Sequence, residues 1–260
     1  MIDLVDTHCH IHFDDYPLPA DEVIAAAKKA GVNRMLCVGT TLADSRLATE
    51  FVADKAGLWA TVGVHPYGAA QFVVATDAGK LADLAGKPKV VAIGETGLDY
   101  HRSREFKLEQ EKALRAHIET GLAKKLPYVF HVREAWDDFW RIFDEYKGLS
   151  GVVHSFSSGR AELDEVLNHG LYVGLNGIMS FTHDRQQLQA AKAVPAEKLL
   201  FETDAPFLTP KPFRGKTCEP KHVAAVAEFL ADLRNEPIAQ LARATTRNAL
   251  ALFSLKEKND

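Results

Sequence analysis

The stretch VVAIGETGLDYH, residues 90–101, joins a short apolar run to a group of polar side chains. Its first part, Val90–Gly94, has the apolar and β-branched composition of a buried parallel strand. Glu95, Asp99 and His101 follow at the point where that strand is expected to end. Carboxylates and an imidazole directly after a buried strand favour an α/β protein, in which chemistry collects at the carboxyl ends of the strands.

Short runs of the same character recur along the whole chain. They cover Ile2–Asp6, Arg34–Val38, Trp59–Gly63, Tyr128–Phe130, Gly151–Val153, Leu171–Gly174 and Leu199–Glu202. Helix-forming segments separate them, such as PADEVIAAAKKAG, which opens with acidic residues and closes on Gly31. Since parallel strands need crossovers, eight such units predict a closed (β/α)8 TIM-type barrel. An open doubly wound sheet is the alternative, but no G-x-G-x-x-G follows the first strand.

The length and composition are those of one globular domain, which we expect to cover residues 1–260. The chain is 47% hydrophobic and 25% charged. No apolar run reaches the ~18 residues of a membrane span, and the first residues lack a basic, cleavable leader, so no membrane contact is expected. Three scattered cysteines, Cys9, Cys37 and Cys218, indicate a reducing cytoplasmic location. The net charge of −4 argues against a broad basic surface that coats duplex DNA.

Side chains that commonly bind metals follow five of the eight predicted strands. They are His8, His10, Glu95, His131, His154 and Asp204. Taken singly, each has a structural explanation: a histidine can be a hydrogen-bonded core residue, Glu95 can cap a turn, and Asp204 can form an Asx turn. Taken together, four imidazoles and two carboxylates on one rim are a ligand set suited to Zn, Mn or Fe, and less typically to Mg. The number of ligands favours two metal ions.

Such a site predicts metal-assisted hydrolysis. Glu95 is placed to bridge two ions held ~3.5–4 Å apart. A water bound to the ions then loses a proton near neutral pH. Asp204 can ligate a metal and accept that proton.

Seven segments together resemble the TatD-type metal-dependent deoxyribonucleases, a branch of the amidohydrolase superfamily. They are VDTHCHIHF, GVHPY, AIGETGLDYH, HVRE, VVHSFSSG, FETDAPFLTP and FRGKTCEP. The resemblance implies a TIM-like barrel, divalent metal ions and hydrolysis of DNA phosphodiester bonds, often as a 3′→5′ exonuclease. It places the family's ligand positions on the six residues named above. Thr217 and Cys218 depart from the family's basic or Asn residue followed by Asn, and HSFSSG carries one extra residue before its glycine, so substrate preference is the open question.

Three further residues are candidates for substrate binding. His65 would hydrogen-bond the scissile group or position a phosphate, unless it only forms a turn before Pro66. Arg133 follows His131 by two residues on the same strand face and would clamp a phosphate through two hydrogen bonds. Arg214 belongs to a set of loop cations that form either a phosphate track or a solvated surface, with Arg102, Arg104, Lys211 and Lys216.

The expected cofactors are two divalent ions (Mg, Mn or Zn), and the expected partner is DNA as single strands or ends, with no obligate protein partner. A small-molecule amidohydrolase or esterase on the same barrel is the main alternative. Such enzymes often carry a carbamylated lysine near the end of strand four, and residues 90–101 contain no lysine. A catalytically idle scaffold is a third hypothesis, whose signature would be a lost ligand, and none of the six is missing.

Overall fold

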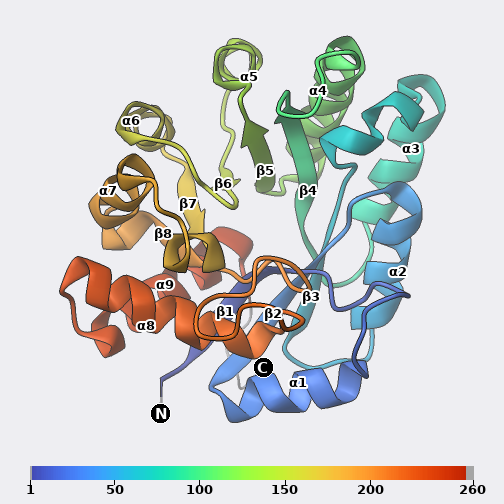
Figure 1. The fold of residues 1–260 in the computed structure, drawn as a ribbon. Coiled ribbons are helices and arrows are strands. Elements are labelled where there is room, and N and C mark those ends of the chain that lie inside the picture. Colours follow the sequence, from blue (N-terminus) through green and yellow to red (C-terminus); the bar gives the residue numbers. More distant parts are fainter. Residues whose placement is uncertain (1, 256–260) are drawn as a thin grey trace. The chain divides into compact units, whose positions relative to one another are not determined.

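The computed structural model describes residues 2–255. The chain divides into two compact units. Unit 1 comprises Met1–Leu36 and Ser155–Asp260, and unit 2 comprises Cys37–His154. Eight strands, β1 to β8, alternate with helices along the chain (Figure 1), and their order in the sheet is the order of the sequence. This division does not test the prediction of one domain over residues 1–260, which stays a prediction.

Unit 1 contains the first and last parts of the βα series. Its strands are β1 (Leu4–Cys9), β2 (Val32–Val38, which ends in unit 2), β7 (Tyr172–Leu175) and β8 (Leu199–Phe201). Its helices are α1 (Ala20–Lys29), α6 (Arg160–Asn168), α7 (Arg185–Ala193), α8 (Val223–Arg234) and α9 (Ile238–Phe253), with the short 3-10 helices η2 (Gly177–Ser180), η3 (Ala196–Lys198) and η4 (Pro220–His222). Strands β7 and β8 are parallel, and Val173 lies opposite Leu199. Helix α9 packs against β1 and β8 and so covers the strands that carry the unit's polar residues.

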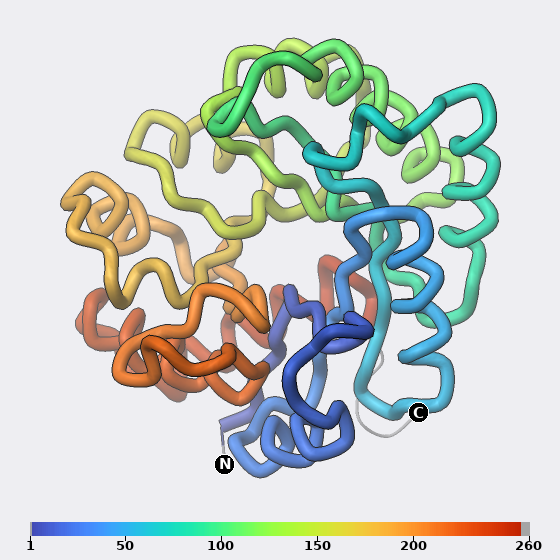
Figure 2. Tube along the Cα trace, turned by 45° about the vertical axis from the view of Figure 1, so that its right-hand side comes forward, coloured from blue at the N-terminus to red at the C-terminus, as the bar shows by residue number. Residues whose placement is uncertain are grey.

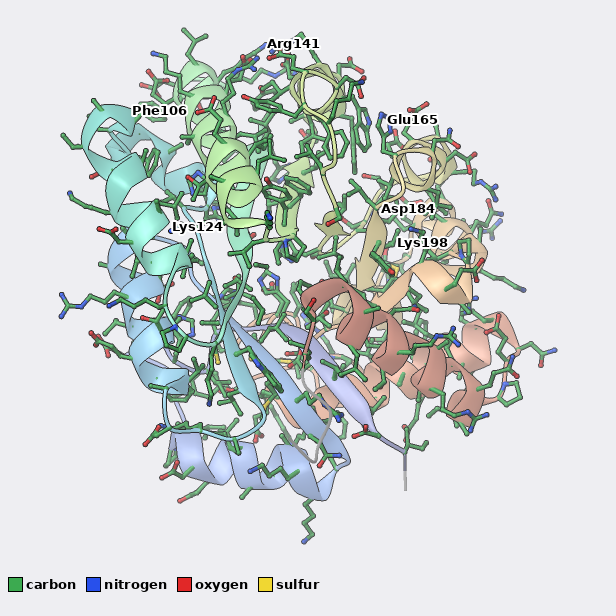
Figure 3. All side chains as sticks on the ribbon, turned by 180° about the vertical axis from the view of Figure 1, so that it is seen from behind. Phe106, Lys124, Arg141, Glu165, Asp184 and Lys198 are labelled. Carbon is green, nitrogen blue, oxygen red and sulfur yellow. The ribbon has the colours of Figure 1, made fainter. Side chains whose placement is uncertain are left out.

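Unit 2 contains the middle of the series. Its strands are β3 (Leu58–Val62), β4 (Val90–Asp99), β5 (Tyr128–Arg133) and β6 (Gly151–Val153). Its helices are α2 (Leu42–Val52), α3 (Val74–Ala85), α4 (Lys107–Lys124) and α5 (Trp136–Phe143), with the 3-10 helix η1 (Pro66–Gln71). All three strand pairs of this unit are parallel. Helices α3 (teal) and α4 (green) lie side by side in Figure 2, and Figure 3 labels Phe106 and Lys124 at the two ends of α4.

The eight predicted strands are present, but β1, β4 and β5 extend further than their apolar runs. Strand β1, predicted over Ile2–Asp6, covers Leu4–Cys9 and so includes His8. Strand β4 continues through the polar residues to Asp99, and β5 continues to Arg133. The reason is that their backbones stay paired beyond the apolar part, with Gly97 opposite His131 and Asp99 opposite Arg133. The polar residues near the carboxyl end of the strand keep the strand geometry. A prediction from the apolar pattern alone therefore places the end of the strand too early.

Strand β4 is irregular at the glutamate that the sequence singles out. Its register against β5 shifts between Ile93 and Thr96, and Gly94 and Gly97 have φ values of 146° and 149°. Such a bulge re-aims side chains and requires glycine at positions with this backbone conformation. The bulge thus sets the direction in which Glu95 points. Among the helices of residues 2–255, none combines the length and apolar character of a membrane-spanning helix.

Candidate functional site

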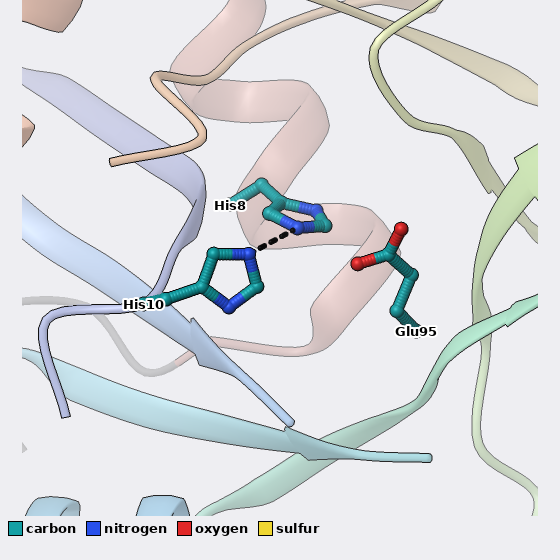
Figure 4. A group of neighbouring side chains, drawn as sticks. All are labelled: His8, His10 and Glu95. Atoms are coloured by element: carbon teal, nitrogen blue, oxygen red, sulfur yellow. Dashed lines mark hydrogen bonds between the residues drawn. The ribbon is translucent and has the colours of Figure 1, made fainter. Parts of the chain in front are cut away.

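In unit 1, three of the predicted ligands lie together. His8 is inside β1, His10 follows it, and Asp204 follows β8. The Nε2 atoms of His8 and His10 are 3.3 Å apart (Figure 4). They lie 3.5 Å and 3.3 Å from Oδ1 of Asp204. We call these residues the unit 1 cluster; its three donor atoms converge on one point, as ligands of a shared cation do.

The backbone between β1 and β8 sets the position of this cluster. The Asp204 amide donates to the carbonyl of His8 at 2.8 Å. The buried Asp6 carboxyl group accepts from both the amide and the hydroxyl of Thr203, at 2.9 Å and 2.6 Å. Burial raises the pKa of Asp6 well above its usual value, although its hydrogen bonds to Thr203 oppose this. Asp6 thereby ties the first strand to the residue before Asp204.

Glu202 is buried one residue before Thr203, and its contacts are structural. Its Oε1 atom accepts from the Ser155 amide at 2.6 Å and from the Asn176 side chain at 3.4 Å. A Cβ at Gly174 would collide with the Glu202 carboxylate, so the missing side chain leaves room for it. Through these contacts Glu202 orients the residues around it, as carboxylates beside a metal site often do.

In unit 2, Glu95 lies at the centre of three imidazoles. Its Oε1 atom is 2.7 Å from Nε2 of His154, 2.8 Å from Nδ1 of His131 and 3.4 Å from Nε2 of His65. We call these four residues the unit 2 cluster. Burial opposes the charge of Glu95, but the imidazoles of His154, His65 and His131 outweigh burial and hold its pKa well below the usual value. Glu95 is therefore a buried, ionised carboxylate.

Asp99 determines which nitrogen of His131 faces Glu95. Nε2 of His131 is 2.9 Å from Oδ2 of Asp99. Burial opposes the charge of Asp99, but its hydrogen bond with His131 prevails and lowers its pKa to about 2. Because an ionised carboxylate only accepts, Nε2 donates to Asp99, and Nδ1 is the nitrogen that faces Glu95, at 2.8 Å. Burial opposes the charge of His131, but its hydrogen bonds with Asp99 and Glu95 prevail and raise its pKa, so Nδ1 donates to Glu95 and a metal bound there would take the place of that proton. A carboxylate behind a histidine in this way is typical of metal ligands.

Helix α4 holds Asp99 from the other side. The Gln110 side chain accepts from the Asp99 amide at 2.8 Å and donates to its carbonyl at 3.0 Å. This double hydrogen bond fixes the end of β4. The sequence offered a signal for Asp99, which lies in the GETGLD segment, but none for Gln110, which lies in the middle of a helical pattern.

His65 has the geometry of a hydrogen-bond donor. Its Nδ1 accepts from the Tyr67 amide at 3.1 Å, so in the neutral ring Nε2 carries the proton and faces Glu95. Burial lowers the pKa of His65 to about 4, which keeps the ring neutral. His65 also precedes the 3-10 helix that starts at Pro66, so the turn expected as its structural role is present as well.

The two predicted arginines lie in different units. Arg133 is the exposed last residue of β5 in unit 2. Arg214 is exposed in unit 1, where it donates to the Thr209 carbonyl at 2.9 Å and lies 3.9 Å above the Phe181 ring. The buried Cys218, one of the departures from the family pattern, anchors the same loop because its carbonyl accepts from Tyr16 at 2.7 Å. The substrate-binding roles of both arginines stay predictions.

Comparisons with known proteins identify the family of this chain. The family model described as TatD related DNase matches residues 5–254. The chain is 34% identical to a protein of Bacillus subtilis named an uncharacterized metal-dependent hydrolase, YabD, over 97% of this chain and 99% of the relative. It is 36% identical to the 3′-5′ ssDNA/RNA exonuclease TatD of Escherichia coli, over 90% and 93%. The crystal structure of YJJV, a TatD homologue from Escherichia coli, superposes with a TM-score of 0.90 at 26% identity and covers 98% of this chain and 100% of the other.

The fold and the site define a metal-dependent hydrolase on a (β/α)8 barrel, and the predicted fold class is confirmed. More narrowly, the chain belongs to the TatD related DNase family. The family resemblance inferred from the sequence motifs is thereby confirmed as well.

Proposed function

We propose that this protein is a divalent-metal-dependent deoxyribonuclease that hydrolyses DNA phosphodiester bonds as a 3′→5′ exonuclease. One structural observation carries the proposal: Glu95 is buried with its Oε1 atom 2.7, 2.8 and 3.4 Å from nitrogens of His154, His131 and His65. A buried carboxylate surrounded by imidazole nitrogens is a ligand set suited to a hydrolytic metal ion. The relative from Escherichia coli named a 3′-5′ ssDNA/RNA exonuclease supports the choice of a nucleic-acid substrate.

The residues of both clusters fit divalent ions. The unit 1 cluster offers two imidazole nitrogens and a carboxylate oxygen that converge. In the unit 2 cluster, Nδ1 of His131 and Nε2 of His154 lie 2.8 Å and 2.7 Å from Oε1 of Glu95, and Asp99 behind His131 leaves Nδ1 as the nitrogen that would bind an ion. We assign two ions (Mg, Mn or Zn) to the six predicted ligands His8, His10, Glu95, His131, His154 and Asp204, because the number and the types of these side chains suit two divalent ions. When bound, such ions lower the pKa of water and polarise a phosphoryl oxygen.

The protein's own groups then have defined tasks. Asp204, at the edge of the unit 1 cluster, accepts the proton of the attacking water. Glu95 remains a carboxylate over the working pH range because its pKa lies well below the usual value. His65, neutral with its proton on Nε2, donates to a non-bridging phosphate oxygen without adding a charge. Arg133 and Arg214 bind flanking phosphates, for which the planar guanidinium is suited.

The proposed location is the cytoplasm. Cys9, Cys37 and Cys218 are all buried thiols in the structure. Cysteines kept as buried thiols are typical of a reducing compartment.

The test is hydrolysis of single-stranded DNA labelled at either end, by metal-stripped protein before and after addition of Mg, Mn or Zn. Shortening from the 3′ end that requires metal supports the proposal. The Glu95→Gln variant, which keeps the size of the side chain, should lose the activity and bind less metal by mass spectrometry. If loaded wild-type protein cleaves neither DNA nor RNA, the proposal is wrong and a small phosphoester or amide becomes the substrate to test.

A further inference from the structure

Beside the unit 2 cluster lies a stacked pair that the proposed function does not use. Tyr67 belongs to η1, directly after His65, and Arg102 belongs to the loop after β4. The guanidinium carbon of Arg102 is 4.7 Å from the centroid of the Tyr67 ring. Arg102 is exposed, and 42% of Tyr67 is exposed. The pair thus presents a flat cationic and aromatic surface to solvent.

This surface lies directly beside the unit 2 cluster, because Tyr67 contacts His65. The Tyr67 ring centroid is 4.7 Å from that of His65, and Nε2 of His65 is 3.4 Å from Glu95. The Tyr67 amide also donates to Nδ1 of His65. Tyr67 is therefore held next to the proposed phosphate donor by both its backbone and its ring.

The charges around Tyr67 favour an anionic strand. Burial, and then a hydrogen bond with Asp99, raises the pKa of Tyr67, while the charges of Arg102 and Arg133 act in the opposite direction. Both cations are thus close enough to Tyr67 to act on its hydroxyl. As an exposed pair, Tyr67 and Arg102 contribute little to folding stability, so stability alone gives no reason for this arrangement.

We propose that Tyr67 and Arg102 form a stacking site for one nucleobase of the substrate strand, beside the phosphate that is handled at the unit 2 cluster. The proposal rests on the proposed function and names the substrate class more narrowly. Bases stack on aromatic rings and on guanidinium planes, and such stacking tolerates any base because every base has a π face. A base has to leave its duplex neighbours to stack in this way. The site therefore selects single strands and unpaired ends over intact duplexes.

The first experiment measures binding without turnover. Fluorescence anisotropy with a labelled single-stranded oligonucleotide, measured in the presence of a chelator to prevent turnover, gives the dissociation constants of wild-type protein and variants. Tyr67→Ala should weaken binding by roughly 5- to 100-fold, the range measured for loss of one base–aromatic stack. Tyr67→Phe, which keeps the ring, should bind like wild type. Tyr146→Ala, a loss of another partly exposed tyrosine of unit 2, is the matched control and should have no effect.

Two variants of Arg102 test whether the planar shape of its guanidinium matters as well as its charge. Arg102→Lys keeps the positive charge but removes the plane, so it should weaken binding nearly as much as Arg102→Ala. If Arg102→Lys binds like wild type, the residue supplies only charge and the stacking site is refuted. Equal losses in Tyr67→Phe and Tyr67→Ala would also refute it, because the hydroxyl and its contact with Asp99 would then carry the effect.

An abasic strand separates stacking from phosphate contacts. With abasic residues at the 3′ end, wild type and Tyr67→Ala should bind equally, and a loss that persists on this strand overturns the proposal. Failure of wild type to bind the normal strand overturns it too. The proposed function can fail separately from the stacking site. If wild type cleaves no nucleic acid with any metal but still binds the strand with bases more tightly than the abasic strand, the proposed function is wrong and the stacking site stands. If wild type is active and Tyr67→Ala has the same binding and the same KM, the stacking site is wrong and the proposed function stands.

Discussion

Asp99→Asn removes one negative charge from behind His131 while keeping the size of the side chain. In the wild-type protein the Asp99 carboxylate accepts from Nε2 of His131 at 2.9 Å and from the His101 amide at 2.9 Å. The asparagine oxygen can replace only one of these acceptors, and the bond to His131 is no longer assisted by charge. When its ring is neutral, His131 is then free to place its proton on Nδ1, the nitrogen that faces Glu95. A protonated Nδ1 cannot bind a metal.

The expected magnitude follows from the pKa of Asp99. The folded structure lowers this pKa from 3.8 to about 2. That shift corresponds to about 2 kcal/mol of interaction with the charged form, part of which solvent screens. Loss of a carboxylate behind a ligating histidine typically costs 10- to 100-fold in metal affinity. We therefore expect the variant to bind zinc or manganese about 10- to 30-fold more weakly than wild type.

Competition against a fluorescent chelator measures this affinity directly and does not require turnover. The control is Asp138→Asn, which removes a carboxylate of the same unit that pairs instead with Lys107 and Arg141, at 2.7 Å and 3.0 Å. Partly exposed pairs of this kind contribute little, so the control should bind metal like wild type. Wild-type affinity in Asp99→Asn, or an equal loss in both variants, would refute the assigned role of Asp99.

Three further outcomes are expected. Burial lowers the pKa of His117 to about 4, and its neutral ring accepts from the Val64 amide. The stability that this ring contributes is therefore complete above pH 6.5 and is lost as the pH falls towards 4. In urea unfolding across this range, His117→Gln should lose about 3 kcal/mol less stability than wild type. In the same denaturation assay, Gly97→Ala should lower the free energy of unfolding by about 1–3 kcal/mol, because Gly97 has a φ of 149° and a Cβ there would meet the backbone of His131. Gly79→Ala should raise the free energy of unfolding by about 0.5–1 kcal/mol, because Gly79 lies in the middle of α3 with open space around it. Chelation should lower the melting temperature in calorimetry, and metal at 100 times its Kd should restore about 2.7 kcal/mol; an unchanged melting point would argue against resident ions.

Much of the candidate site could be predicted from local patterns. The alternation His8–Cys9–His10 indicates a shared face for the two histidines, and the structure brings their Nε2 atoms within 3.3 Å. An apolar run followed by Glu95 indicates a strand that carries a carboxylate near its end. These features depend on the alternation of side chains along a strand and on the collection of functional side chains at a strand's carboxyl end. Both can be recognised from residues that are neighbours in the sequence.

The tertiary structure decided the features that depend on segments distant in the chain. No local pattern pairs Asp99 with His131, which lies 32 residues away, or reveals that this pairing selects the metal-facing nitrogen. In the same way, Arg102 reaches the Tyr67 ring only because the loop after β4 lies beside the segment after β3. The physical reason is that sequence periodicity specifies which face a side chain occupies, whereas proton positions, pKa values and ring stacking depend on the atoms that packing places within a few ångströms.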